Sequence, residues 1–371
     1  MRVVIAKKLL STVGGSEAQA RALAAALRDL GHDVTLVGLR PRYRRTGIPS
    51  SVYVAPAGDV RLEEQGLTYR FIASPGALVE GVFPVSLVRP EQLRDALAGA
   101  DVVHCLAREW ASPYERAARA VGATFVETPL VHPGQPFSGD GAADIARYGR
   151  DDAVLGLTEW EAAWYRRHGA RRAMVTGIGA ILPNGGAPVI AGPDRAPEPA
   201  SVLFVGRKER YKGYDALRLA ARIVWRERPD ATFVVIGQRR FLGPAPLADP
   251  RWSEPGIVSE ARKAEAYARA AVFAMPSDHE TFGHTYLEAW SAGRPVIAGD
   301  IPPLREVVRE GIDGLHASNE PHAIAEAILT LLADPARATA MGAAGRVRVT
   351  ERFTWPIIGK LTEAAYEAAR R

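Results

Sequence analysis

Cysteine is almost absent from this 371-residue sequence, which contains a single one, Cys105. One cysteine excludes a fold held by internal disulfide bonds and fits a reducing compartment. In the run VVHCLA we expect Cys105 to be a buried apolar residue of a strand. No apolar run approaches the roughly 20 residues that cross a membrane, and the N-terminal MRVVIAKKLL lacks a signal-peptide core. The sequence therefore predicts a cytoplasmic protein.

Several ligand motifs are also missing. The eight histidines form no His-x-x-x-His pair and none pairs with cysteine at metal spacing, so we expect no zinc site. There is no Asp-x-Asp, through which some nucleotide-sugar enzymes hold a divalent cation, and no G-x-G-x-x-G of nicotinamide enzymes. We therefore expect no metal ion and no permanently bound cofactor.

Charge is abundant but nearly balanced, with 47 Lys and Arg against 42 Asp and Glu and a formal net charge of +5. This surplus permits an anionic partner without identifying one. The densest basic run is RPRYRR, Arg40–Arg45. A solvated loop is the simpler interpretation, and contact with an anionic acceptor or with the inner membrane face is the alternative. No nucleic-acid motif accompanies the run, so we expect no nucleic-acid partner.

The first half alternates between strand-like and helical stretches. Strand patterns at 3–6 and 34–39 flank a Gly-Gly loop and a helical stretch at 17–30, which is a parallel β-α-β unit. Further strands are expected at 101–106, 123–127 and 153–157, and helices near 90–98, 112–121 and 159–168. Between 48 and 88, the runs SVYVAP and TYRFIA predict added strands or loops.

The alternation restarts after residues 182–200, which hold five prolines and three glycines without an amphipathic period. The repeated pattern predicts an α/β fold of two Rossmann-like, doubly wound parallel-sheet domains. We expect an N-terminal domain at 1–182, a linker at 183–200, a second domain at 201–352 and a C-terminal helix at 353–371.

The first candidate site is the GGSE stretch, which lies between a strand and a helix. Gly14 and Gly15 would let the backbone approach a ligand, and the helix start offers N–H groups to an anion. The simpler interpretation is a tight turn in which Ser16 caps the helix.

The second candidate is VGRKERYKG at 205–213, directly after the first strand of the second half. Arg207 and Lys212 would lie beyond the carboxyl end of that strand, where α/β sheets bind ligands. Two such cations suit a diphosphate. A solvated basic loop is the alternative, because Lys208 and Arg210 lie between them.

The third candidate is HETFGHTYLEAW at 279–290, in which Glu280 lies in a loop and Glu288 about one turn into a helix. Phe282, Gly283 and His284 would present N–H groups at the helix start, which favours phosphate. Carboxylates accept bidentate hydrogen bonds from vicinal hydroxyls, so the stretch suggests a sugar and a ribose flanking a phosphate. An acid that merely complements the helix dipole is the alternative.

The fourth candidate is His132, in ETPLVHPG just after a first-half strand. A lone histidine in such a position is more often structural than functional.

Together these stretches resemble glycosyltransferase family 4, the retaining enzymes of the GT-B fold, over nearly the whole chain. The resemblance is carried by GGSE, GHDV, TPLVHPG, TEWE, GIG, VGRKERYKG, HETFGHTYLEAWSAGRPVIAGDIPPLREVV and RFTW. Its most specific part is the Glu-x7-Glu segment followed by EAW-x-x-G-x-PVIA. It implies two domains facing a cleft, transfer of a sugar from a UDP- or GDP-sugar, and a last helix that crosses back to the first domain.

The resemblance also implies roles for individual residues. Arg207 and Lys212 would hold the diphosphate, Glu288 the ribose and Glu280 the transferred sugar. The remaining implied contacts are backbone groups of Phe282, Gly283, His284 and Thr285, a base wall at GIVS including Val258, close approach at Gly14 and Gly15, and sugar contact by His132.

Two departures from the family matter. His284 stands where the family often has a small or apolar residue, so its side chain could select the donor sugar. Residues 40–88 match no family pattern, which leaves the acceptor open among saccharides, lipid-linked molecules and small molecules. The alternatives are a GT-B sugar-nucleotide epimerase and a non-catalytic nucleotide-sugar-binding protein; a phosphorylase and an oxidoreductase lack their motifs.

Overall fold

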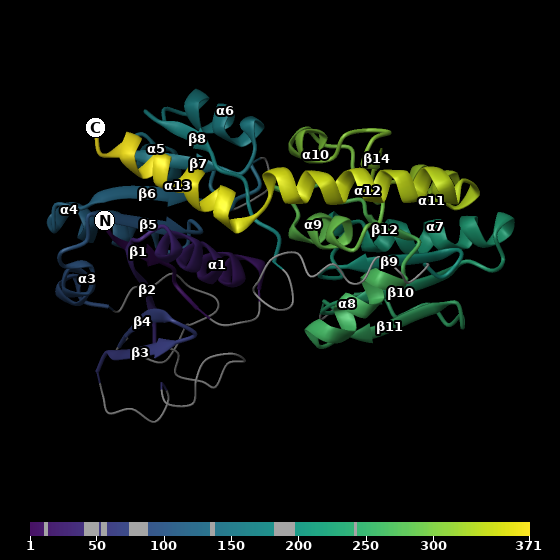
Figure 1. The fold of residues 1–371 in the computed structure, drawn as a ribbon, viewed down its shortest axis with the longest axis horizontal. Helices are drawn as coiled ribbons and strands as arrows, with labels where there is room; N and C mark the ends of the chain where they lie inside the picture. Colours follow the sequence, from purple (N-terminus) through teal and green to yellow (C-terminus); the bar gives the residue numbers. More distant parts are fainter. Residues whose placement is uncertain are drawn as a thin grey trace. The chain divides into compact units, whose positions relative to one another are not determined.

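The computed structural model describes residues 1–10, 14–40, 52, 58–73, 88–133, 138–181, 197–240 and 243–371. The chain divides into two compact units, one formed by Met1–Ile178 with Trp355–Arg371 and the other by Gly179–Thr354. Figure 1 shows a sheet covered by helices in each unit. The predicted boundary at 182/183, most of the linker, Arg42–Arg45 and nearly all of SVYVAP lie outside the described residues.

The sheet of the first unit has the order β3-β4-β2-β1-β5-β6-β7-β8. All neighbours are parallel except β3 and β4, which pair antiparallel. The strands are β1 Arg2–Ala6, β2 Asp33–Leu39, β3 Val60–Glu64, β4 Leu67–Ile72, β5 Val102–Leu106, β6 Thr124–Thr128, β7 Ala153–Gly156 and β8 Ala173–Val175. The helices are α1 Gly15–Asp29, α3 Pro90–Leu97, α4 Ala111–Ala120, α5 Ala142–Tyr148, α6 Glu159–Arg167 and α13 Trp355–Ala369.

Helices cover both faces of this sheet, because its central strands carry apolar side chains on both sides. All five residues of β5 are buried, including Cys105 as predicted. Leu23 and Leu27 of α1 pack with Tyr366 of α13 in one core, and Tyr114 of α4 belongs to the core of the opposite face. The doubly wound prediction is therefore confirmed for this unit.

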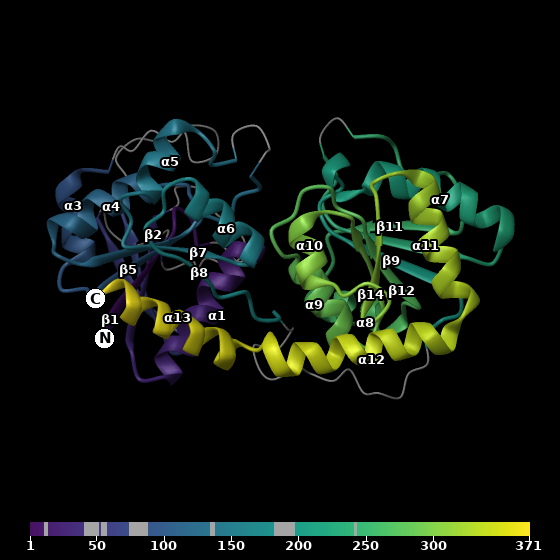
Figure 2. The ribbon, with the colours of Figure 1, turned by 90° about the horizontal axis from the view of Figure 1, so that it is seen from above.

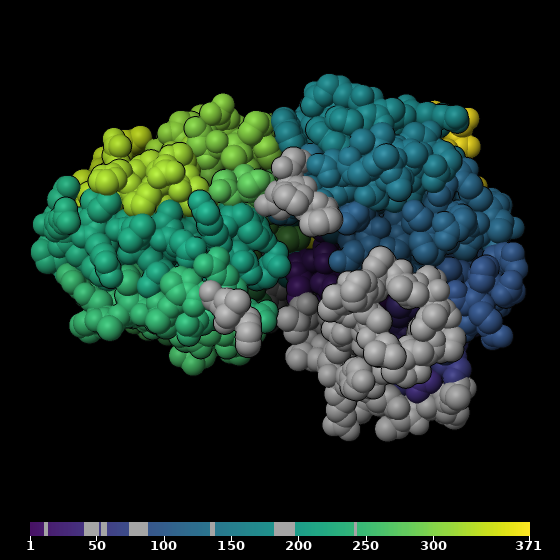
Figure 3. All heavy atoms as spheres, turned by 180° about the vertical axis from the view of Figure 1, so that it is seen from behind, coloured from purple at the N-terminus to yellow at the C-terminus, as the bar shows by residue number. Residues whose placement is uncertain are grey.

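The C-terminal helix α13 lies beside α1 (Figures 1 and 2). A Cβ atom on Gly359 would lie 3.1 Å from the Ala26 side chain, so the two helices approach closely at this glycine. His104 of β5 bonds the Tyr366 hydroxyl at 2.7 Å and the Thr128 hydroxyl at 2.7 Å. In the space-filling view, yellow C-terminal atoms lie beside the blue atoms of the first unit (Figure 3).

The sheet of the second unit is parallel throughout its described strands, in the order β11-β10-β9-β12-β13-β14. The strands are β9 Ser201–Val205, β10 Thr232–Ile236, β11 Trp252–Gly256, β12 Val272–Met275, β13 Val296–Gly299 and β14 Gly314–Ala317. The helices are η1 Arg210–Lys212, α7 Tyr214–Glu227, α8 Glu260–Arg269, α9 His284–Ser291, α10 Pro302–Val307, α11 Pro321–Ala333 and α12 Pro335–Arg352. None of the helices within the described residues has the length and apolar character to cross a membrane.

Several elements were not predicted from the sequence. They are α5, β8, β11, β14 and α12. TYRFIA, residues 68–73, proves to hold most of β4, which pairs with β3. The helix α12 begins at Pro335, capped by the Asp334 side chain, which accepts from the backbone N–H of Arg337 at 2.9 Å. Its apolar residues are mostly alanines and glycines, so the helical period in its sequence is weak.

Candidate active site

The second unit places its predicted site residues where the chain order of the sheet reverses. β9 and β12 are neighbours, and the chain proceeds outward from β9 through β10 and β11 and from β12 through β13 and β14. Arg207–Lys212 follow the carboxyl end of β9, and Glu280 and the start of α9 follow β12. Ligands of open α/β sheets bind at such a switch point.

The loops after these two strands are held together by backbone contacts. The Asp278 backbone N–H donates to the Tyr211 carbonyl at 2.9 Å, and the Ser277 hydroxyl donates to the same oxygen at 3.0 Å. Gly213 has φ 81°, and a Cβ atom there would lie 2.7 Å from the Pro276 carbonyl oxygen. Glycine is therefore required at 213 for both its conformation and its close approach to the second loop.

Lys212 and Glu280 form an ion pair across this junction. Their side chains are 13% and 8% exposed, so the pair is largely removed from water. The other carboxylate oxygen of Glu280 accepts from the Thr281 backbone N–H at 3.2 Å. Lys212, which the resemblance assigns to the diphosphate, is thus in direct contact with Glu280, which it assigns to the transferred sugar.

Tyr211 connects the two predicted phosphate-binding cations. The Lys212 ammonium lies 5.3 Å from the centre of the Tyr211 ring, and the Arg207 guanidinium lies 5.7 Å from it. Arg207 also donates to the Tyr211 hydroxyl. Such cation–π contacts are strongest where the cation is desolvated, and here they orient both cations around one ring.

The alternative of a solvated basic loop is wrong for Lys208. Its side chain is 3% exposed and its ammonium lies 2.7 Å from the Glu254 carboxylate, which is itself buried. Glu254 also accepts from the Tyr214 hydroxyl at 2.7 Å and the Trp252 indole N–H at 2.6 Å. The Lys208 side chain therefore fastens the loop after β9 to β11, while Arg207 beside it is exposed.

The helix α9 begins at His284, after Gly283 at φ 87°. A Cβ atom on Gly283 would overlap the Tyr286 ring. Within the described residues no side chain caps this helix, so its first N–H groups point toward the loop after β12. The Phe282 side chain is buried and contacts Phe353 edge-on at 5.2 Å, leaving its backbone as the part able to reach a ligand.

His284 is neutral at pH 7, because burial lowers its pKa from 6.5 to about 4. Its Nδ1 atom is buried and has no hydrogen-bond partner among the described residues. Thr285, the next residue, donates through its hydroxyl to the Met275 sulfur at 3.5 Å.

Glu288 has two partners that the sequence reasoning missed. One carboxylate oxygen lies 3.0 Å from the Lys263 ammonium, and the other accepts from the Tyr267 hydroxyl at 2.8 Å. Burial nevertheless raises the pKa of the Glu288 carboxyl. The sequence shows that Lys263 and Tyr267 are four residues apart and share one face of α8, but it does not show which carboxylate they contact.

Val258 lies in the loop between β11 and α8 and lines a cavity of about 250 Å³. Val234, Ile236 and Pro255 line the same cavity and give it an apolar side. Ile257, the neighbour of Val258, is 69% exposed. The GIVS stretch thus presents apolar surface at the edge of the sheet.

The remaining predicted residues belong to the first unit. Gly14 has φ 137° and precedes α1, and Gly15 is the first residue of that helix. The expectation that Ser16 caps α1 is wrong, since its hydroxyl donates instead to Glu17 at 3.0 Å. Glu17 lies 3.1 Å from the Lys7 ammonium after β1, which ties the helix start to that strand.

His132 is half-buried in the loop after β6. The loop leaves the strand through Leu130, which has φ 52°, an uncommon conformation for leucine. Arg40, the first residue of the basic run, donates to the Val52 carbonyl at 2.9 Å and the Gly58 carbonyl at 3.0 Å. Its guanidinium therefore supports the first unit internally.

Two family models match the chain, one in each half. The model described as "Glycosyl transferase 4-like domain" matches residues 14–185, and "Glycosyl transferases group 1" matches residues 191–348. The chain belongs to the GT-B glycosyltransferases of the family 4 kind. The resemblance stated above is therefore confirmed.

Curated relatives of this chain match it over part of their length. A D-inositol 3-phosphate glycosyltransferase of Segniliparus rotundus is 32% identical over 186 residues, covering 47% of this chain and 41% of the relative. A glycogen synthase of Mycobacterium tuberculosis is 33% identical over 181 residues, covering 47% of this chain and 44% of the relative. The matched region thus spans less than half of each relative.

Solved structures share the fold of this chain over nearly its whole length. Anabaena Alr3699/HepE, in complex with UDP and glucose, superposes with a TM-score of 0.77 at 16% identity and covers 99% of both chains. Sucrose-phosphate synthase from Thermosynechococcus elongatus gives a TM-score of 0.71 at 20% identity, covering 99% of this chain and 98% of that one. The GT-B fold prediction is confirmed.

Proposed function

We propose that this glycosyltransferase moves a sugar from a nucleotide-diphosphate sugar to an acceptor hydroxyl, with retention of anomeric configuration and without a bound metal ion. The observation that carries the proposal is the Lys212–Glu280 pair at the switch point, in the same two loops as Arg207 and the start of α9, which no side chain among the described residues caps. It combines positive charge, backbone donors and a carboxylate at one edge of the sheet.

Positive charge and backbone donors would hold the diphosphate. Arg207 offers a forked donor and Lys212 a point charge, and both lie at the Tyr211 ring. The first N–H groups of α9 add the positive end of a helix. Negative charge develops on the diphosphate as it leaves, so donors fixed in advance lower the barrier. In this proposal the two side-chain cations supply the charge that a divalent cation supplies in metal-dependent enzymes.

The two carboxylates would hold hydroxyl groups on either side of the diphosphate. Each carboxylate oxygen can accept more than one hydrogen bond, so Glu288 keeps lone pairs for ribose hydroxyls after accepting from Lys263 and Tyr267. Glu280 would hold the sugar, with its orientation fixed by Lys212 and the Thr281 N–H. His284, neutral and buried, would contact the same sugar.

The proposed chemical step takes place on one face of the sugar. The acceptor oxygen forms a bond to the anomeric carbon as the bond from that carbon to the diphosphate oxygen breaks. The acceptor proton passes to the leaving phosphate oxygen. Glu280 is already engaged by Lys212 and Thr281, which favours a positioning contact over attack on the anomeric carbon.

The donor base stays open between uracil and guanine. The structure of HepE holds UDP and glucose, whereas a Corynebacterium glutamicum relative, 32% identical over 160 residues, is named for GDP-mannose. Val258 and the GIVS stretch would form the base wall, and Gly14, Gly15 and His132 would contribute contacts from the first unit, as the resemblance implies.

The test combines a donor panel with product analysis. The purified chain is screened by thermal shift against UDP-, GDP- and ADP-sugars, and stabilising donors are incubated with saccharide, lipid-linked and small-molecule acceptors in EDTA. NMR of the product should show the anomeric configuration of the donor. Inversion, or activity abolished by EDTA and restored by Mg²⁺, would refute the corresponding part of the proposal. Donor turnover without acceptor would indicate an epimerase, and binding without turnover a non-catalytic protein.

A further inference from the structure

The residue directly before Glu280 is a histidine that has no part in the function proposed above. His279 lies in the loop after β12, at the same carboxyl edge of the sheet as the candidate active site. Its Nδ1 atom lies 2.7 Å from a carboxylate oxygen of Asp278. Since a carboxylate accepts hydrogen bonds, Nδ1 carries the proton and donates it to Asp278. The neighbouring acid therefore sets the orientation of the imidazole ring.

Asp278 is itself held in place by an amide. Its other carboxylate oxygen accepts from Nδ2 of Asn319 at 3.1 Å, and the same Nδ2 donates to the Arg210 carbonyl at 3.0 Å. Asn319 follows β14, so the loops after β9, β12 and β14 meet at this amide. Asn319 and Asp278 thus fix the ring of His279, as carboxylates commonly do for functional histidines.

The second nitrogen of the ring, Nε2, is able to contact a ligand. Among the described residues no hydrogen bond engages it, and the His279 side chain is 37% exposed. The ring lies edge-on to Tyr211, with 6.4 Å between the ring centres. The Arg207 guanidinium and the Lys212 ammonium lie at the same tyrosine ring. Three nitrogen-bearing side chains therefore surround Tyr211 at the switch point.

The charged groups near His279 have both signs. The Asp278 carboxylate contacts its ring directly, whereas Glu280, the next residue, is paired with Lys212. Arg207 adds a positive charge from the loop after β9. A protonated His279 would therefore have one counter-charge in Asp278 and could share a second, on a bound anion, with the two other cations.

We propose that His279 is a further donor-binding residue, whose protonated Nε2 donates a hydrogen bond to a phosphoryl oxygen of the nucleotide diphosphate. This role rests on the proposed function, which brings a diphosphate to Arg207 and Lys212. Hydrogen bonds from a charged donor to phosphate are about twice as strong as neutral ones. Histidine changes its charge between about pH 5 and 8, whereas arginine and lysine ordinarily keep theirs. The affinity for the diphosphate should therefore depend on pH through His279, with Asp278 and Asn319 as positioning residues.

Isothermal titration calorimetry of the full chain with UDP and with GDP, between about pH 5.5 and 8.5, tests this contact. The phosphate groups of the ligand also titrate, so the quantity compared is the ratio of wild-type affinity to His279→Gln affinity, in which that contribution cancels. The ratio should be about tenfold near the lower pH, the effect of one charge-assisted hydrogen bond, and about one near the higher pH. His279→Gln should melt at the wild-type temperature, because an exposed pair such as His279 with Asp278 contributes little stability.

Asp278→Asn tests the positioning role. It removes the charge that holds Nδ1, so it should weaken UDP or GDP binding at the lower pH and not at the higher. Combined with His279→Gln, it should lose no more than His279→Gln alone. The matched control is His322→Gln, since His322 is an exposed histidine of α11. That variant should bind as the wild type does at every pH.

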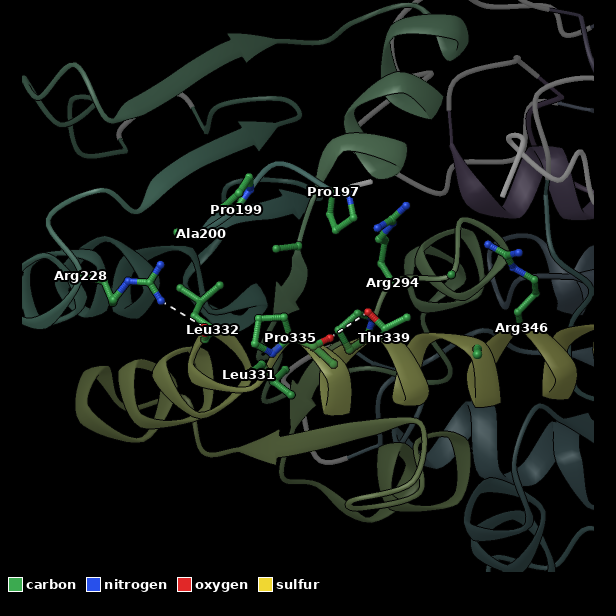
Figure 4. A pocket seen from close by; sticks show the side chains of 15 residues that line it. Pro197, Pro199, Ala200, Arg228, Arg294, Leu331, Leu332, Pro335, Thr339 and Arg346 are labelled. Atoms are coloured by element: carbon green, nitrogen blue, oxygen red, sulfur yellow. Dashed lines mark hydrogen bonds between the residues drawn. The ribbon is translucent and has the colours of Figure 1, made fainter. Parts of the chain in front are cut away.

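A further control concerns where in the second unit the nucleotide binds. A cavity of about 460 Å³ lies at the opposite edge of the sheet, where Ala200, Ala271 and Pro295 directly precede β9, β12 and β13 (Figure 4). Ala343→Trp would fill part of it, since Ala343 is an exposed residue of α12 that lines it. This variant should leave the affinity for UDP and GDP, and its pH dependence, unchanged.

The outcomes separate the role of His279 from the proposed function. If UDP or GDP binds but the ratio for His279→Gln stays constant with pH, at one or above it, His279 acts on the structure of the loop at most and its proposed role is overturned alone. Loss of binding in Ala343→Trp would place the diphosphate at the other edge of the sheet and also overturn it. Failure of the wild-type chain to bind UDP, GDP and ADP alike would overturn both.

Discussion

Replacing Lys212 with methionine removes the cation that faces Glu280 and keeps most of the apolar length of the side chain. The Glu280 carboxylate, 8% exposed, would retain the Thr281 N–H at 3.2 Å but lose its charged partner. A buried acceptor left without such a partner costs about 1–3 kcal/mol of stability. The Lys212→Met variant should therefore still fold, with a lower melting temperature.

The expected effect on catalysis is larger. Under the proposed mechanism Lys212 donates to the leaving diphosphate, and removing one donor of that kind costs about 10²–10³ in turnover, or roughly 2.7–4 kcal/mol. The assay is release of nucleoside diphosphate from the best donor with acceptor present. Lys360→Met, an exposed lysine of α13, should leave turnover unchanged.

A double-variant cycle distinguishes an effect of Lys212 through the orientation of Glu280 from a direct contact of Lys212 with the donor. If Lys212 acts mainly by orienting Glu280, Lys212→Met combined with Glu280→Gln should lose no more than the worse single variant. If Lys212 and Glu280 contact the donor separately, the fold-losses in turnover of the two single variants should multiply. A loss below about tenfold for Lys212→Met, roughly 1.4 kcal/mol, would refute its assigned role.

Three further predictions concern stability. Gly283→Ala should lower the free energy of unfolding, measured in urea, by about 1–3 kcal/mol, because φ is 87° and a Cβ overlaps Tyr286. Gly311→Ala, at φ 72° in open space, should cost less. Arg147→Met should lower the free energy of unfolding, measured in urea, by about 3–5 kcal/mol, because the buried Glu127 carboxylate loses the guanidinium that lies 2.7 Å from it. A smaller loss would mean that Glu127 is protonated in the folded state. Burial lowers the pKa of His104 from 6.5 to about 3, so its neutral form contributes stability above pH 6.5 that is lost as pH falls toward 3. His104→Gln should reduce the change in the free energy of unfolding between pH 6.5 and 3. An unchanged pH dependence would contradict a neutral His104 in the folded state.

Much of the fold could be predicted because its strands and helices have clear periods. The buried strands VVHCL and SVLFV and the amphipathic helix YDALRLAARIVWRE stand out in the sequence. The missed elements are short or weakly patterned. β11 has the sequence WSEPG and becomes a strand through pairing with β10, a tertiary effect that local propensity does not contain.

The residue types of the site could be predicted from the sequence, but not which of its side chains contact one another. The stretch HETFGHTYLEAW showed that acids flank a helix start, yet nothing in it reveals that Lys212 contacts Glu280 or that Lys263 contacts Glu288. Lys208 and Lys212 look alike in the sequence, yet Lys208 pairs with Glu254 of β11 and Lys212 pairs with Glu280. Such pairings join residues far apart in the chain, so a local pattern cannot encode them.

The return of α13 to the first unit makes the second unit an insertion within the first. Residues Trp355–Arg371 complete a unit that begins at Met1, and Tyr366 of this segment bonds His104 inside its core. Chains are made from the amino end, and domains tend to fold as they emerge. Here the second unit has all of its residues before the first does. The first unit can therefore form the contact between Tyr366 and His104 only after the second unit has been synthesised.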